Sequence, residues 1–157
     1  MPRPIYIICS QGGSEDKANG QLSLFQIIDK LFLRRNPPNA PPPPPQPGVS
    51  QVRITASWMG VAGDHNQEFE FETRMFFPPE NAMFAVAKGT FIFNQDMQRL
   101  TNVLVGPMPI KGPGILRVQN RVRRIGGDEW TAQEYPIIVE EVIPPPPQPP
   151  NPEEQPA

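Results

Sequence analysis

Residues 68–75 read Glu-Phe-Glu-Phe-Glu-Thr-Arg-Met, and this stretch decides the fold class. Charged and apolar side chains alternate along it, so an extended chain places Phe69, Phe71 and Met75 on one face and all four charged residues on the other. Successive side chains of a β-strand point to opposite faces of the sheet. The alternation is typical of an antiparallel sheet with one face in a core and the other in water.

The same pattern recurs on both sides of this stretch. In residues 52–58 the even-numbered positions are expected to face the core. In residues 115–125 we expect Leu116, Val118 and Val122 to face it, with Arg117, Gln119, Arg121 and Arg123 facing water. Both stretches therefore predict strands with one buried face.

Shorter apolar runs, separated by glycine, proline and polar residues, predict the remaining strands. We place these strands at residues 5–9, 83–86, 90–93, 100–105, 130–135 and 137–139. A turn at Lys88-Gly89 is expected to separate the second and third of them. Short strands at such regular spacing, without a convincing helix, predict a two-sheet antiparallel β-sandwich.

Residues 21–33 are the ambiguous segment. Their apolar positions do not keep a strict period of two, and the offsets of Leu24, Ile27, Ile28 and Leu31 also suit a helix. A strand with a bulge explains the slip as well, and we favour the strand.

Proline is the compositional outlier, with 24 residues in the 157-residue chain. It concentrates in residues 36–48 and in residues 144–157. Proline cannot donate ladder hydrogen bonds, so the first segment is expected to be a proline-rich internal loop and the second a disordered tail. Residues 1–143, which include the internal loop, are expected to form a single domain.

The charge balance points away from nucleic acid and membranes. Acidic side chains number 16 and basic ones 14, so no global positive charge favours nucleic acid or an anionic membrane. The apolar run at residues 5–9 is too short for a signal-peptide core, and no run approaches the length of a membrane helix. With a single cysteine, these observations favour a cytoplasmic location.

Few residues suit catalysis. His65 follows Asp64 in a predicted turn, and a solvated turn histidine is the favoured interpretation over a triad member. Cys9 is expected to be a buried small hydrophobe rather than a reactive thiol. Without Cys/His clusters or a phosphate-binding glycine loop, we expect no metal, no cofactor and no enzymatic activity.

Three arginines form a basic stripe. Alternation places Arg117, Arg121 and Arg123 on one face of one strand. The favoured interpretation is a solvated sheet face whose arginines pair with a second stripe formed by Glu68, Glu70 and Glu72. The alternative is a surface for an anion or an acidic partner.

The internal proline segment offers a second candidate surface. Residues 35–41 match the basic-x-x-Pro-x-x-Pro pattern of an SH3 ligand, with Arg35, Pro38 and Pro41 at the defining positions. A stiff solvated spacer is the favoured interpretation of the same residues.

The order of features resembles a family of uncharacterised bacterial all-β domains. The chain opens with an apolar strand at residues 5–9, a polar turn at 10–16 and a glycine-led strand at 20–29. Near its end it has an apolar strand at 102–105, a Pro-Gly corner at 112–118 and the last hairpin strand at 136–139. The resemblance rests on this order. The resemblance implies a β-sandwich and no particular activity.

These observations favour a non-catalytic protein-binding or assembly domain with an unidentified protein partner. The alternative is a small-ligand or carbohydrate-binding module that uses Trp58, Trp130 or Tyr135 as exposed aromatic residues. An enzyme built around His65 ranks third.

Overall fold

The computed structural model describes residues 1–16, 18, 21–34 and 51–142. The described residues form nine strands and no helix, which confirms the all-β class and the two sheets. The proline-rich loop 36–48, the tail 144–157 and the candidate residues Arg35, Pro38 and Pro41 lie outside the described residues.

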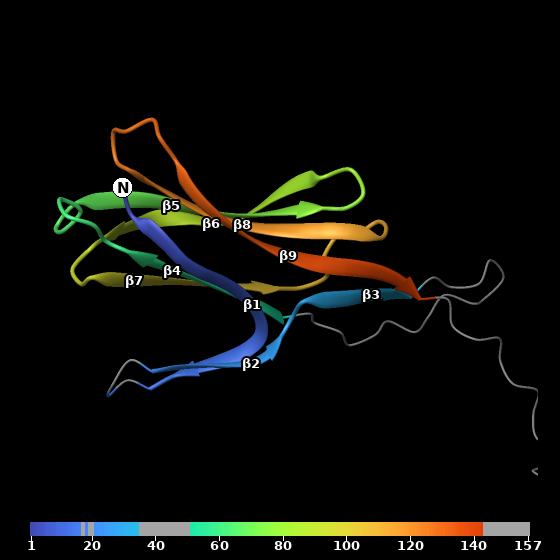
Figure 1. The fold of residues 1–157 in the computed structure, drawn as a ribbon. Helices are drawn as coiled ribbons and strands as arrows, with labels where there is room; N and C mark the ends of the chain where they lie inside the picture. Colours follow the sequence, from blue (N-terminus) through green and yellow to red (C-terminus); the bar gives the residue numbers. More distant parts are fainter. Residues whose placement is uncertain (17, 19–20, 35–50, 143–157) are drawn as a thin grey trace, which may run out of the picture.

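The two sheets lie face to face (Figure 1). The four-stranded sheet has the order β2 (Leu22–Ile27), β1 (Arg3–Glu15), β4 (Gln51–Met59) and β7 (Met97–Val105). The five-stranded sheet has the order β3 (Lys30–Arg34), β9 (Thr131–Val142), β8 (Gly114–Arg124), β5 (Glu68–Phe77) and β6 (Ala82–Ile92).

One pairing corrects the expectation of a purely antiparallel sandwich. Strand β3 pairs with β9 in parallel, with Lys30 opposite Ile138. Side-chain alternation has the same period in both kinds of ladder, so it could not reveal this direction.

Residues 21–33 are two strands in different sheets rather than one bulged strand or a helix. The chain crosses between the sheets at Ile28 and Asp29. The Ile28 amide donates to the Cys9 carbonyl at 2.8 Å, and the Asp29 carbonyl accepts from the Ile138 amide at 2.9 Å. The apolar positions of residues 21–33 are irregularly spaced because the chain changes from one sheet to the other within this segment.

Three predicted turns or breaks are wrong. Strand β1 continues through the polar residues 10–15. Strand β6 runs straight through Gly89, where an added Cβ would lie 2.9 Å from the Phe71 ring, so this glycine permits close packing instead of a turn. Strand β9 continues through Pro136, which precedes the start of its β3 pairing at Ile138.

The expected core is confirmed. Ile54, Phe69, Met75, Leu116 and Val118 from three central strands belong to one buried cluster. Phe71 packs against this cluster and is partly buried.

A chain of polar side chains crosses this core. The Trp58 indole N–H donates to Asn120 Oδ1 at 2.7 Å, and Asn120 Nδ2 donates to Thr73 Oγ1 at 2.8 Å. Asn102 Nδ2 donates to the same hydroxyl at 2.9 Å. Trp58 and Asn102 belong to one sheet and Asn120 and Thr73 to the other, so the network joins the two sheets.

Strand β1 curves strongly, so that its C-terminal half and β2 form a hairpin that lies below β4 and β7 of the same sheet (Figure 1). Glu15 near its tip pairs with Arg99 of β7 at 2.8 Å. Thr55 and Ser57 face this hairpin side of the sheet and are fully buried. The even positions of residues 52–58 are buried as expected, and the hairpin explains why two odd positions are buried as well.

We expect Asn120→Ala to lower the free energy of unfolding by about 3 kcal/mol. The change removes two hydrogen bonds and leaves the buried Trp58 N–H without its partner, a loss of about 1–3 kcal/mol for each unsatisfied group. Urea denaturation measures this difference. The neighbouring Gln119→Ala is the control, because Gln119 bonds to Glu134 on the exposed face. Equal effects of the two variants would contradict a structural role for the network.

Candidate functional site

The arginine stripe lies on the outer face of the five-stranded sheet. Arg121 contacts Glu72 at 2.7 Å, and Arg123 forms an ion pair with Glu70. These partners stand directly opposite in the β5–β8 register. The expected pairing is therefore present for two of the three glutamates, and each such pair contributes about 0.2–1 kcal/mol.

Aromatic rings support the same arginines. The Arg121 and Arg123 guanidinium groups lie 3.9 and 4.6 Å from the centroid of the half-buried Trp130 ring. Arg117 lies 4.8 Å from the centroid of Phe76 and 3.7 Å from Glu134. Each of the three arginines therefore has both an acidic partner and an aromatic ring beside it.

None of the three aromatic residues proposed for ligand binding, Trp58, Trp130 and Tyr135, is fully exposed. Trp58 is fully buried, so its expected exposure is wrong. Its even position in the alternating stretch already indicated an inward side chain. Arg121 and Arg123 cover Trp130. Tyr135 is half-buried, and burial, with smaller effects of Cys9 and Asp29, raises its pKa.

A groove of about 600 Å³ opens beside the stripe, on the side toward β6. Its lining comes from three neighbouring strands of the five-stranded sheet: Glu72, Thr73, Arg74, Met83, Ala85, Val86, Ala87, Lys88 and Arg121. The β5–β6 register shifts between Thr73 and Arg74, which makes Val86 an extra residue in β6. Such a bulge disrupts the ladder locally and re-aims side chains, and it coincides with the groove.

The groove carries excess positive charge. Arg74, Lys88 and Arg121 line it together with a single carboxylate, Glu72. Glu72 contacts Arg74 at 2.9 Å and Arg121 at 2.7 Å, so one glutamate holds two guanidinium groups in place. Three cations against one carboxylate leave two positive charges uncompensated among the lining residues.

Sequence reasoning identified Arg121 but missed the groove. Arg74 and Lys88 come from strands other than that of the stripe, and the bulge at Val86 brings them around one depression. The sequence signal for it was the apolar run at residues 82–87, which does not alternate with polar residues as residues 68–75 do.

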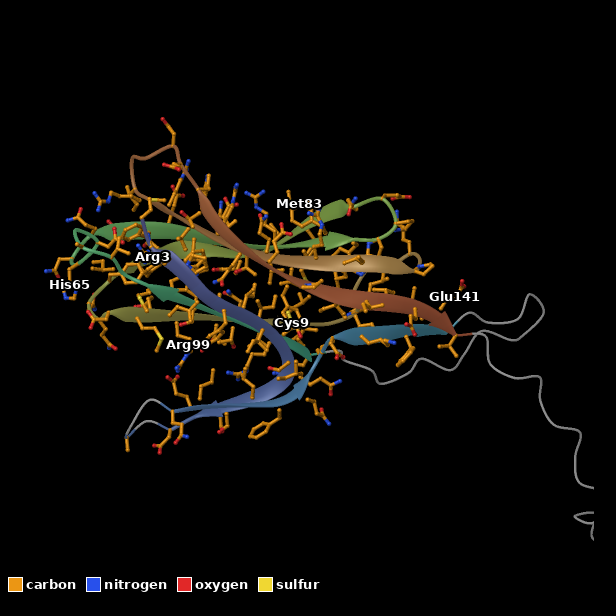
Figure 2. The ribbon with its side chains drawn as sticks, viewed as in Figure 1. Arg3, Cys9, His65, Met83, Arg99 and Glu141 are labelled. Atoms are coloured by element: carbon orange, nitrogen blue, oxygen red, sulfur yellow. The ribbon has the colours of Figure 1, made fainter. Side chains whose placement is uncertain are left out.

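Asp64 stabilises a turn, and the neighbouring His65 is exposed. His65 is exposed at one end of the sandwich (Figure 2), whereas Asp64 is buried. The Asp64 carboxylate accepts from the Val61 amide at 3.0 Å and lies 3.5 Å from Arg124 Nη2. These contacts stabilise the turn.

Cys9 is fully buried between the layers (Figure 2), and burial raises its pKa to about 12. Such a thiol stays protonated near neutral pH and is a poor nucleophile. Within the described parts of the chain, no group of three His, Cys, Asp or Glu side chains is placed to hold a metal ion. The described residues also contain no helix long and apolar enough to cross a membrane.

The buried thiol predicts a pH dependence of stability. The Cys9 pKa rises from 9.0 to about 12 on folding, so between these values the unfolded chain releases a proton that the folded chain keeps. The Cys9 contribution to stability is complete below pH 9 and declines toward pH 12, by about 1.4 kcal/mol per pH unit. Urea denaturation of the native chain and of Cys9→Ala across this range should show the steeper loss only in the native chain. If the stability of the two proteins fell in parallel between pH 9 and pH 12, the raised pKa of Cys9 would be refuted.

No protein-family model matches this chain, and no curated protein matches it either.

Proposed function

We propose that this is a non-catalytic protein-binding domain whose partner places an acidic, partly apolar segment in the groove over β5, β6 and β8. The observation that carries the proposal is the excess positive charge around an apolar floor. Glu72 is shared by Arg74 and Arg121, so among the lining residues it offsets only one of the three positive charges.

The cations of the groove are suited to carboxylates. Glu72 orients Arg74 and Arg121 before any ligand arrives, which lowers the entropy lost on binding. Lys88 lies on the opposite wall, on exposed strand β6. A carboxylate between these groups gains charge-assisted hydrogen bonds, which are about twice as strong as neutral ones.

The floor of the groove suits apolar side chains. Met83 is 57% exposed and points away from the core (Figure 2). Methionine is flexible and adapts to different apolar surfaces, a property common at binding sites for protein segments. Ala85 and Val86 continue the floor, so the partner segment combines acidic with apolar residues.

A small ligand is the competing occupant. The volume of about 600 Å³ lies within the usual range for small-molecule sites. A carbohydrate platform has less support, since Trp58 is buried and arginines cover Trp130. A role of the Arg35–Pro41 motif in recognition stays a separate prediction.

The test uses a fluorescein-labelled peptide of alternating Glu and Leu, and a matched peptide with Lys in place of Glu. Fluorescence anisotropy should show binding of the Glu peptide only, weakening as salt rises. Lys88→Glu should weaken this binding about tenfold or more, since 1.4 kcal/mol corresponds to a factor of ten.

Lys111→Glu is the matched control, because it makes the same charge change outside the groove, at a side chain 69% exposed. It should leave affinity within about twofold. Equal binding of the two peptides, or equal effects of the two variants, would reject the acidic segment. Binding of glutarate or maltose in the groove without any peptide binding would likewise reject the acidic segment, and would favour the small-ligand alternative.

A further inference from the structure

Strand β7 is an open edge of the four-stranded sheet. It pairs with β4 along its whole length, without a register shift, and has no second strand partner among the described residues. Edge strands usually carry proline, charged side chains (lysine above all) or a bulge that discourages pairing with another chain. The sequence Met-Gln-Arg-Leu-Thr-Asn-Val-Leu-Val of residues 97–105 contains no proline or lysine, and its one charged residue is Arg99.

The backbone direction of β7 follows from one hydrogen bond. The Gly60 amide donates to the Asp96 carbonyl at 2.9 Å, so the even-numbered residues direct their backbone groups toward β4. Because these directions alternate along a strand, the odd-numbered residues direct theirs to the open edge. Gln98 Nε2 donates to the Arg99 carbonyl at 3.3 Å, which agrees with an outward carbonyl at that position.

The side chains of the odd-numbered residues make this edge apolar. Met97 and Val103 are each 44% exposed, and Val105 is 64% exposed. The one charged side chain of this strand, Arg99, pairs with Glu15 of the hairpin at 2.8 Å.

We infer that β7 pairs with β7 of a second copy of this chain, antiparallel and centred on Thr101. Met97 then lies opposite the partner's Val105, and Thr101 lies opposite Thr101. Arg99 lies opposite Val103, so no like charges meet. All these positions have outward backbone groups, which is the hydrogen-bonded register of an antiparallel pair. The two four-stranded sheets become one continuous sheet across a twofold axis.

The other long edge, β6, fits a second copy less well. It contains Lys88 and the bulge at Val86, both of which protect an edge. The edge strands β2 and β3 are shorter, with 6 and 5 residues. The β7 pairing also leaves the groove free, because the groove lies on the other sheet.

The experiment measures the mass of the full chain by sedimentation velocity across the micromolar range. The native chain should show a concentration-dependent dimer. Thr101→Pro should raise the dimer dissociation constant at least about tenfold. Its backbone N–H points to the open edge, so proline removes no bond to β4 and the melting temperature should change little.

Val103→Lys should weaken the dimer in the same way, and Ile92→Lys on the β6 edge is its matched control. A native chain that stays monomeric throughout overturns the inference. A dimer that survives both β7 variants, or one weakened only by Ile92→Lys, also overturns it. Peptide binding in the groove is measured separately, so either proposal can fail alone.

Discussion

The hydrogen-bond network inside the core sets the relation between the two sheets. Apolar packing alone tolerates small shifts of one sheet over the other, because dispersion and the hydrophobic effect have little directionality. Buried polar groups tolerate less, since each costs free energy unless its partner is in place. Trp58 and Asn102 from one sheet reach Asn120 and Thr73 from the other, so the network is satisfied only in one alignment of the sheets.

That alignment determines the outer face of the five-stranded sheet. Thr73 faces the core, so its neighbours Glu72 and Arg74 face outward, where they lie opposite Arg121 and Gln119 of β8. Glu72 then holds Arg74 and Arg121 together, and the bulge at Val86 opens the groove beside them. Most charges on this face are therefore paired within the sheet, and the excess positive charge lies in the groove.

The four-stranded sheet is organised differently on its outer side. The crossing at Ile28 and Asp29 sends the chain from one sheet to the other, and the preceding hairpin folds across the outer face. It buries Thr55 and Ser57, which would otherwise face water. Strand β7 stays uncovered along its edge among the described residues, which separates a candidate self-association surface from the groove on the opposite sheet.

The sequence by itself determined the class of fold and the inward faces of residues 52–58, 68–75 and 115–123. The period of a strand is a local property, so no distant partner is needed to recognise it. The parallel pairing of β3 and the joining of Arg74, Lys88 and Arg121 around one groove were decided only in the tertiary structure. They depend on which strands become neighbours and in which register, and those contacts link residues far apart in the chain.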